Sequence, residues 1–589
     1  MGQVIDSDVL VIGGGGAAAR AALEAHRSGA GVTMVMKGSF GKCGATAYRV
    51  AEIAGYNAAD GLIDPEDTPD EHLRDILAAA AGTCDERLAR ILAREAPATL
   101  RELEDWNVPL ERVGDRYLEV LGCFATRPRM HIVRGHAEPI LAAMVSRIRN
   151  IGVTVVEDTL VTRILLQDGA CVGAVGLRKS GEIVVFRAGA VAMGTGGGGQ
   201  LFLNNLNPPD VVGDGYALAF RAGAELVNLE FMQSGPGIVH PVTNILNGWV
   251  WLLHPRLYNA QGEEFLPRYL PSGMSAERCM DLRSGHYPFS TYDGSQWIDV
   301  SIQKEILSGR GTKDGGVYVD FTASSEDALP TSQRGEDVRR MWATTKRWLL
   351  EERHLDVMKE PVQVAIFGHA INGGMRIGEN CETTIRGLFA AGEAAGGPHG
   401  ADRLGGNMVN NLMVFGRRMG LFAADRARAN TIHWKSDELV ANEEARLKAM
   451  LVRSGEWKPL DLRRRIQEAM WRGVLVVRSE EKLLACLREL GEIRSAWETD
   501  LQVGDAREMW RALEVENMLE VGEIMARSAL LRTESRGSHY REDCPKRDDA
   551  HWEKSIITRL ADGDMQQYTV RLPRLNKAGA PDQSEESKR

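Results

Sequence analysis

The chain has little cysteine and no closely spaced cysteine pair. No two of its eight cysteines stand in the C-x-x-C spacing that is typical of zinc and iron–sulfur sites. We therefore predict no metal site in this chain. Scattered thiols are typical of proteins from a reducing compartment. The cysteines are Cys43, Cys84, Cys123, Cys171, Cys279, Cys381, Cys486 and Cys544.

Long apolar runs and an excess of positive charge are also missing. The apolar runs fall far short of the roughly 18 residues that cross a bilayer, and the strand-like segment Asp8–Ile12 begins too early for a leader to precede it. The formal net charge is −10, and no basic stretch carries interleaved aromatic residues. We predict a cytoplasmic protein with no membrane span and no nucleic-acid partner.

Glycine is abundant in segments where the backbone could approach a ligand closely. Gly13-x-Gly15-x-x-Ala18 follows a strand-like segment and opens a helix, the setting in which such a turn binds a pyrophosphate. We predict that Gly13, Gly15, Gly16 and Ala18 bind a cofactor; a plain strand–turn–helix is the alternative. Lys37 stands where the acid that binds the ribose of NAD is usual, which disfavours simple NAD binding.

A second glycine-rich loop and a distant helix start indicate one long ligand. The loop Gly194–Gly199 costs chain entropy unless something lies against its backbone. Far along the chain, Gly387–Glu393 precedes an apolar helix pattern, and a helix beginning near Asn407 would point its free N–H groups at the ligand. Such a helix end stabilises negative charge on a reduced flavin by about 0.3–2 kcal/mol. We therefore predict a flavin enzyme that binds FAD.

Two cationic side chains stand in glycine-rich turns. His369 lies in Phe367-Gly-His-Ala-Ile-Asn-Gly-Gly374, and Arg403 lies in His399–Asn407. A lone histidine or arginine of this kind is more often a structural hydrogen-bonding or ion-pairing residue. The occurrence of both favours a shared anionic ligand.

Taken together, these motifs resemble the flavoprotein family of succinate dehydrogenase, fumarate reductase, L-aspartate oxidase and adenylylsulfate reductase. The resemblance extends from the first strand to about Trp552. It implies an FAD-dependent oxidoreductase that transfers hydride between flavin N5 and a carboxylate-bearing substrate. The segments that carry the resemblance are Gly213-Asp-Gly215, Leu229–Gln233, Gly368-His369 with Gly373-Gly374, His399–Asn407 and Thr533–Asp543.

The resemblance also implies the site residues, position by position. His369 and Arg403 match the family's substrate-carboxylate ligands and are predicted to be catalytic. Glu393 matches the residue that holds the ribityl side of the flavin. The other predicted cofactor-binding residues are Lys37, Gly44, Ala45, Thr46, Thr195, Gly196, Gly197, Asp214, Arg403, Gly406 and Asn407.

The predicted fold class is α/β, with a Rossmann-like FAD-binding domain, an inserted α+β capping domain and a C-terminal helical domain. At 589 residues the chain exceeds what one hydrophobic core usually supports. Amphipathic patterns such as Leu460–Arg472 and Lys482–Trp497 predict the helical domain. We place the FAD-binding domain at 1–240 and 356–435, the cap at 241–355, the helical domain at 436–545, and a C-terminal extension at 546–589 with a disordered tail at 576–589.

Departures from the family pattern concern the cofactor and the substrate. Gly44 stands at the position of the flavin-linking His, so non-covalent FAD is predicted. Gly235 and Gly237 replace a substrate-binding His and Thr, and Ser295 stands in place of the proton-donating Arg of the cap. Each missing charged hydrogen bond is worth about 1.5–3 kcal/mol. Succinate itself is therefore disfavoured, and a bulkier or more apolar acid is predicted.

Several assignments in the predicted cap and the C-terminal motif stay open. Ser295 and Arg283 are taken as catalytic, with Arg278, His286 and Tyr287 as alternatives for moving the proton. Three tryptophans either line the substrate pocket or pack the core of the cap: Trp249, Trp251 and Trp297. Three residues either contact the flavin or cap or form a structural ion-pair network: Arg536, His539 and Arg541.

Two other functions stay open as alternatives. A flavoprotein subunit similar to adenylylsulfate reductase would work with an iron–sulfur or ferredoxin-type partner, and the cysteine spacing requires another chain to carry those centres. A flavin electron-transfer subunit without substrate chemistry is the remaining candidate, motivated by the missing arginine of the cap.

Overall fold

A seven-stranded sheet forms the centre of the chain, whose computed structural model describes residues 3–429 and 434–575. Parallel strands run through its middle, with β1 (Gln3–Ile12) between β2 (Val32–Val35) and β11 (Ile183–Met193). The strand order is β8-β2-β1-β11-β10-β9, and β19 also pairs with β11. The remaining bounds are β8 Thr154–Val156, β9 Thr159–Gln167, β10 Ala170–Arg178 and β19 Leu388–Ala390. The predicted tail 576–589 lies outside the described residues.

Two helices that are far apart in the sequence pack together on this sheet, α1 (Gly16–Arg27) and α9 (Asn407–Arg428). Glycines on α9 permit the close approach, because a Cβ at Gly416 would lie 3.0 Å from the carbonyl oxygen of Ala17. A Cβ at Gly420 would lie only 2.3 Å from that of Ala21. The N-termini of both helices consequently open onto one cavity.

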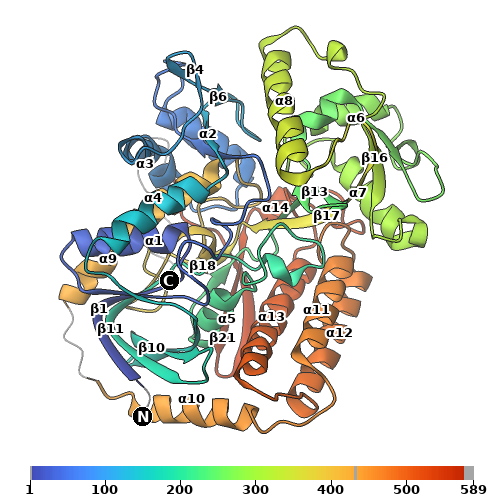
Figure 1. Cartoon of the computed structure of the whole chain (residues 1–589). Helices are drawn as coiled ribbons and strands as arrows, with labels where there is room; N and C mark the ends of the chain where they lie inside the picture. The colour runs from blue at the N-terminus through green and yellow to red at the C-terminus, as the bar shows by residue number, and fades with distance from the viewer. Residues whose placement is uncertain (1–2, 430–433, 576–589) are drawn as a thin grey trace.

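A smaller lobe lies beside this layer, at the upper left of Figure 1. It contains the three-stranded sheet β3-β7-β6 and a short hairpin of β4 and β5. Helices α2 and α3 pack against each other, and α4 packs on α1. The strands are β3 Ile53–Asn57, β4 Arg112–Val113, β5 Arg116–Tyr117, β6 Glu119–Val120 and β7 Met130–Arg134. The helices are α2 Pro69–Ala80, α3 Glu86–Asp105 and α4 Glu138–Arg149.

The insertion predicted as a cap leaves and returns through two neighbouring antiparallel strands, β13 (Met232–His240) and β17 (Val362–Ile371). They belong to a sheet with the order β14-β13-β17-β16-β15. The lobe that they carry is at the upper right of Figure 1. Its other elements are β14 Asn244–Ile245, β15 Arg256–Tyr258, α6 Ala276–Arg283, α7 Gln296–Glu305, β16 Val317–Asp320 and α8 Gln333–Arg353.

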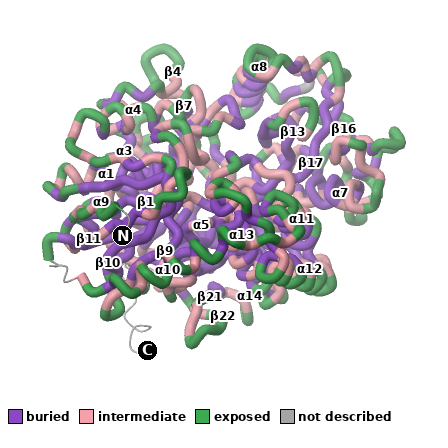
Figure 2. Tube along the Cα trace, turned by 60° about the horizontal axis from the view of Figure 1, so that its bottom comes forward, coloured by how far each residue is buried: buried purple, intermediate pink, exposed green. Residues whose placement is uncertain are grey.

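The predicted helical region is confirmed as helices, drawn at the lower right and bottom of Figure 1. Side-chain caps begin two of them: the side chain of Ser479 accepts from the amide of Lys482, and that of Asp505 accepts from the amide of Glu508. Figure 2 shows that their outer faces are exposed while the central strands are buried. The helices are α10 Asp437–Met450, α11 Pro459–Gly473, α12 Glu480–Thr499 and α13 Ala506–Leu531, which packs on α5 Asp214–Arg221.

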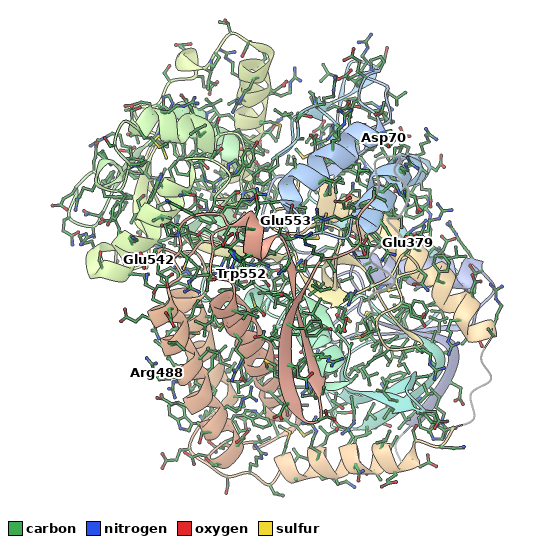
Figure 3. The ribbon with its side chains drawn as sticks, turned by 180° about the vertical axis from the view of Figure 1, so that it is seen from behind. Asp70, Glu379, Arg488, Glu542, Trp552 and Glu553 are labelled. Atoms are coloured by element: carbon green, nitrogen blue, oxygen red, sulfur yellow. The ribbon has the colours of Figure 1, made fainter. Side chains whose placement is uncertain are left out.

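The C-terminal segment returns to the body of the molecule. A hairpin of β21 (Ser555–Ala561) and β22 (Asp564–Val570) pairs with β12 (Leu226–Val227). The sheet continues through β18 (Gly374–Arg376) to β20 (Ala395–Gly396). The short helix α14 (Asp549–Trp552) precedes the hairpin, and the labels of Trp552 and Glu553 mark its C-terminal end in Figure 3. Among the described residues, no helix is both long and apolar enough to cross a bilayer.

These elements establish the predicted α/β fold class, with a Rossmann-like sheet, an inserted lobe and a helical part. The boundaries between the domains, 1–240 with 356–435, 241–355, 436–545 and 546–589, remain our proposal.

Candidate active site

A cavity of about 340 Å³ lies where the N-termini of α1 and α9 meet the predicted cap. Its volume falls in the range of roughly 300–1,000 Å³ that is usual for small-molecule sites. Most of the residues predicted from the sequence line it. These are Gly13, Gly15, Gly16, Lys37, Gly44, Ala45, Thr46, Thr195, Gly196, Asp214, His369, Glu393, Arg403 and Gly406.

The first glycine-rich turn brings bare backbone to the cavity. Gly13 has a φ of 118°, and a Cβ there would lie 2.3 Å from the carbonyl oxygen of Gly194. Helix α1 begins after Gly15 without a side-chain cap. Only the amide of Gly16 finds a nearby side chain, at 3.1 Å from Thr46 Oγ1. Ala18 does not line the cavity, because it is fully buried beneath Gly194.

The second glycine-rich loop surrounds two groups that suit a polyhydroxylated ligand. Thr195 Oγ1 is buried and has no hydrogen-bond partner within the described chain. Gly197 does not line the cavity, but a Cβ there would lie 2.2 Å from Glu393 Oε1, so the glycine makes room for that carboxylate. Glu393 Oε1 accepts from the amide of Ile371 at 2.9 Å, and burial raises the pKa of Glu393 to about 7.

Lys37 is held by two carboxylates. Its Nζ lies 2.6 Å from Asp214 and 2.9 Å from Glu514, which reaches it from α13. Burial lowers the pKa of Lys37, but these two carboxylates outweigh it and raise that pKa above its usual value. The sequence could not place Glu514 here, because the residue lies 477 positions away.

Helix α9 also begins without a side-chain cap, after Gly406 with a φ of 90°. Asn407 does not line the cavity, because its Oδ1 accepts from Asn57 Nδ2 at 2.7 Å and lies 3.0 Å from His72 Nε2. The backbone N–H groups of this 22-residue helix, and its positive dipole end, therefore face the cavity instead.

These features fit FAD. Two uncapped helix N-termini suit negative groups such as a pyrophosphate and a reduced flavin ring. The unpartnered hydroxyl of Thr195 and the carboxylate of Glu393 can bond to hydroxyl groups of a ribityl chain.

Arg403 also lines the cavity, and its guanidinium is held by hydrogen bonds that leave one nitrogen unused. Its Nε donates to Gln233 Oε1 at 3.0 Å and its Nη1 donates to the carbonyl of Leu404 at 2.9 Å. Its Nη2 makes no hydrogen bond within the described residues. The guanidinium keeps its charge, although burial lowers the pKa of Arg403.

His369 lies in the same part of the cavity and is neutral. Burial, together with the charge of Arg403, lowers the pKa of His369 to about 3. The arrangement therefore offers one fixed positive charge and one uncharged imidazole. An anionic group that entered here would find a guanidinium nitrogen without a partner.

Gly235, which the family resemblance predicts to replace a substrate-binding His, has a steric reason to be glycine in this chain. A Cβ at Gly235 would lie 2.9 Å from both Cζ and the carbonyl oxygen of Tyr287. The ring of Tyr287 lies edge-on to His369 with 5.5 Å between centroids, and its buried hydroxyl has no hydrogen-bond partner among the described residues. At Gly237, a Cβ would lie 2.8 Å from Phe367 Cδ2. Aromatic rings of this chain thus lie against both glycines.

Ser295 and Arg283, predicted to be catalytic, do not line the cavity. Arg283 is fully buried within the cap, where its Nε lies 2.9 Å from Asp299 and its Nη1 donates to the carbonyl of His286. Ser295 Oγ lies 3.1 Å from His286 Nε2. Both side chains are therefore committed to holding the cap together, which corrects their expected placement.

Of the three tryptophans in the predicted cap, only Trp249 lines the cavity. Trp251 is fully buried in the core, and Trp297 packs against it. Cys123 and His136 are among the lining residues that were not predicted from the sequence. The dipeptide Gly135-His136 repeats Gly368-His369, and this was the signal for His136 that the sequence offered.

The C-terminal motif forms a structural ion-pair network, one of the two alternatives left open. Arg536 pairs with Glu534, Arg541 pairs with Asp543 at 2.7 Å, and none of the three questioned residues lines the cavity. The motif also reaches the cap. Glu542, labelled in Figure 3, lies 2.9 Å from Lys304 of α7 and 2.6 Å from Lys482 of α12.

Comparison with known proteins gives matches along nearly the whole chain. The family model described as FAD binding domain matches residues 8–409, and that of the fumarate reductase flavoprotein C-terminal region matches residues 463–580. A fumarate reductase (CoM/CoB) subunit from Methanothermobacter marburgensis is 37% identical over 574 residues, which cover 94% of this chain and 97% of that protein.

Solved structures agree with this similarity. Sdh1 of Mycobacterium smegmatis has a TM-score of 0.80 at 30% identity, covering 97% of this chain and 94% of that chain. A quinol–fumarate reductase has a TM-score of 0.83 at 26% identity, covering 98% of this chain and 99% of that chain.

Proposed function

Because this chain belongs to the flavoprotein family of fumarate reductase and succinate dehydrogenase, we propose that it interconverts an unsaturated carboxylate and its saturated counterpart. It is an FAD-dependent oxidoreductase. When bound, FAD supplies the hydride exchange with the substrate carbon. The observation that carries the proposal is the fixed, incompletely paired guanidinium of Arg403 beside neutral His369.

The residues that hold FAD are those of the cavity's glycine-rich end. The N-termini of α1 and α9 stabilise negative charge, and Thr195 and Glu393 offer hydrogen bonds. We propose that FAD is bound without a covalent link, because Gly44, which lines the cavity, has no side chain that could bond to the flavin. Acid precipitation would then leave all of the flavin in the supernatant.

The substrate's carboxylate is anchored by Arg403 through Nη2, and His369 and Tyr287 complete the anchor. Burial raises the pKa of the Tyr287 hydroxyl, so this group keeps its proton and acts as a hydrogen-bond donor. Holding the acid at fixed atoms lowers the entropy cost of bringing its reacting carbon to the flavin. These residues thus act mainly by positioning.

The size of the substrate follows from what lies against the two substituted glycines. The loss of side chains at Gly235 and Gly237 by itself predicts an acid bulkier than succinate. In the structure, however, the rings of Tyr287 and Phe367 occupy the space beside these two glycines. A short unsaturated acid suits such a pocket better, and the relative from Methanothermobacter marburgensis is named a fumarate reductase. We therefore propose fumarate as the first candidate.

Electrons are exchanged with a second protein chain in this proposal. The relative from Methanothermobacter marburgensis is named as a subunit, which supports an assembly of several chains. Within the described part of the chain, no cysteine belongs to a group of three potential metal ligands. An iron–sulfur or ferredoxin-type partner would supply the centres that this arrangement cannot build.

The test is anaerobic reoxidation of the reduced flavin by a panel of acids: fumarate, crotonate and cinnamate. We expect fumarate to reoxidise the wild type fastest. Arg403→Gln should lower kcat/KM by about 10- to 150-fold, because one charged hydrogen bond is worth about 1.5–3 kcal/mol. Tyr287→Phe should lower it by about 2- to 10-fold, the effect of one neutral hydrogen bond.

The matched control is Arg559→Gln, an exposed arginine whose side chain bonds only to Gln566 among the described residues. It should behave like the wild type. Full FAD content with wild-type kcat/KM in Arg403→Gln would reject the assigned anchor. No reoxidation by any acid would favour an electron-transfer subunit instead.

A further inference from the structure

A second cluster of titratable side chains lies on the three-stranded sheet β3-β7-β6. Asp60, Glu119 and His131 each offer one ligand atom, and these three atoms lie within 4.8 Å of one another. Glu119 and His131 face each other across the β6–β7 pair, and Asp60 follows β3. None of the three lines the cavity.

The cluster lies on the far side of this sheet from the cavity. Met130 lines the cavity, and successive residues of a strand point to opposite faces. His131 therefore points away from the proposed FAD site. Glu119 shares the face of His131 because directly paired residues lie on the same side of a sheet.

The distances within the cluster are too long for direct hydrogen bonds. His131 Nε2 lies 3.6 Å from Asp60 Oδ2 and 3.5 Å from Glu119 Oε1, whereas charged N–H···O contacts are about 2.7–2.9 Å. Two ligand atoms on one tetrahedral zinc ion, with bonds of about 2.0–2.2 Å, are separated by about 3.3–3.6 Å. The observed spacing thus matches atoms that share an ion.

All three side chains are buried, and two of the ligand atoms have no hydrogen-bond partner among the described residues. The side chains of Asp60, Glu119 and His131 are 7%, 4% and 1% exposed. Glu119 Oε1 and His131 Nε2 make no hydrogen bond within the described chain. A buried polar atom with no partner costs about 1–3 kcal/mol, so a ligand at this point would remove a penalty.

The neighbouring carboxylates Asp64 and Asp67 pair with arginines, whereas the carboxylates of the cluster do not. Asp64 lies 2.6 Å from Arg127, and Asp67 lies 2.7 Å from Arg129. Neither Asp60 nor Glu119 has a lysine or arginine at ion-pair distance among the described residues. Burial, and after it the charges of Asp60, Asp67 and Asp64, raises the pKa of Glu119 to about 8. Burial lowers the pKa of His131, which leaves its imidazole neutral.

We propose that Asp60, Glu119 and His131 bind one divalent first-row transition cation, with zinc the best fit. One imidazole nitrogen and two carboxylate oxygens suit such an ion, and three protein ligands leave a fourth position for water. The ion links the turn after β3 to strands β6 and β7. Its role is structural, because the cluster lies outside the cavity.

The sequence alone predicted no metal site, because that expectation rested on cysteine spacing. The three ligands stand at positions 60, 119 and 131 and have no local motif. Sheet pairing brings two of them together, and the turn after β3 supplies the third.

The test uses tag-free, full-length, FAD-loaded protein purified without chelators, with metals measured by inductively coupled plasma mass spectrometry. We expect about one zinc ion per chain. Removing the ion with a chelator should lower the thermal midpoint, and adding Zn²⁺ should restore it, because an ion that binds only the folded state stabilises that state. Flavin content should stay unchanged throughout.

In His131→Gln and Glu119→Gln, the amount of bound zinc per chain should fall by about ten-fold or more. The thermal midpoint of these variants should not change when Zn²⁺ is added. His254→Gln is the matched control, since it alters an exposed histidine that lies 2.9 Å from Asp281, and it should keep the ion. Two results would overturn the proposal: variants that keep the ion like the wild type, or wild-type protein with no bound metal and no thermal response to Zn²⁺ or Mn²⁺. Chelation and re-addition of zinc are done on the wild type, so this experiment decides the question even if the variants fail to fold.

Discussion

The absence of a side chain at Gly235 makes room for Tyr287 beside the cavity. The ring and carbonyl oxygen of Tyr287 lie 2.9 Å from the Cβ position of Gly235. Gly235→Ala should therefore lower the free energy of unfolding by about 1–3 kcal/mol, the usual cost of overpacking. It should also lower kcat/KM, because Tyr287 must move. Thermal unfolding and steady-state kinetics check both effects.

Gly491→Ala is the control for this substitution. Gly491 lies within α12, and a Cβ there would meet no heavy atom within 4 Å. Alanine in a helix should stabilise by about 0.5–1 kcal/mol over glycine. If both variants had wild-type stability and activity, the packing account of Gly235 would be wrong.

His72 predicts a pH dependence of stability. Burial, and after it the charge of Arg129, lowers the pKa of His72 from 6.5 to about 4. Between these values the unfolded chain binds a proton that the folded chain does not, so this group makes stability fall as pH falls from 6.5 to about 4. The slope is up to about 1.4 kcal/mol per pH unit.

His72→Gln removes this contribution while keeping a donor for Asn407 Oδ1. The midpoint of the variant should rise relative to that of the wild type between about pH 7 and about pH 5. His354→Gln, at an exposed histidine, should show no such trend. Parallel pH curves for wild type and His72→Gln would contradict the account.

At the scale of elements, the start of α9 determines how a helix end meets the cavity. Gly406 has a φ of 90°, and a Cβ there would lie 2.6 Å from Asn57 Oδ1. Gly406→Ala should weaken FAD binding and lower the thermal midpoint, because backbone strain of about 1–3 kcal/mol adds to the steric contact. Flavin fluorescence titration measures the first effect, and thermal unfolding measures the second.

Gly262→Ala is a closely matched control for this helix start. Gly262 has a φ of 79°, but no heavy atom lies within 4 Å of its Cβ position. It should suffer the backbone strain alone and keep the affinity for FAD. Equal FAD affinity in the two variants would reject a role for the α9 terminus.

Helix α8 is an element that we did not predict from the sequence. Its 21 residues include many charged side chains, but five apolar residues at helical spacing are buried in the core: Val338, Met341, Trp342, Trp348 and Leu349. Contacts made by single residues anchor it: Thr345 Oγ1 donates to Glu52 Oε1 at 2.6 Å, and Trp348 Nε1 donates to Asn244 at 3.0 Å. The apolar spacing of α8 was therefore readable in the sequence, whereas its polar partners, which lie far along the chain, were not.

At the scale of the whole molecule, Arg532 ties distant segments together. It is fully buried, pairs with Glu230 and Glu534, and donates to the carbonyls of Trp552 and Lys554. Arg532→Met would leave buried carboxylates without their partner, so we expect a loss of about 3–5 kcal/mol in stability. Arg559→Met, on the exposed face of β21, should cost at most about 0.5 kcal/mol.

The measurement is the thermal midpoint of both arginine variants with FAD bound. A midpoint for Arg532→Met within one degree or so of the control would show that the network contributes little. FAD content, determined on the same samples, separates a local loss of the cofactor from a global loss of stability.

The cofactor end of the site was largely predictable, because backbone features recur in sequence. Glycine turns and helix starts leave a local signature, and Gly13, Thr195 and Gly406 all line the cavity. The substrate end was less predictable. Ser295 and Arg283 looked suitable by type, but Arg283 pairs with Asp299, and the hydroxyl of Ser295 bonds to His286. Side-chain partners depend on neighbours that sequence order does not reveal.

The sequence by itself determined the fold class, the family and the binding of FAD, since each depends on short stretches whose glycines, caps and apolar patterns act locally. Only the tertiary structure decided which side chains meet. It brought Glu514 to Lys37, placed Tyr287 against Gly235, and gathered Asp60, Glu119 and His131 on one sheet face. The physical reason is that pairing and burial depend on distances in space, and residues hundreds of positions apart in the chain can lie within 3 Å.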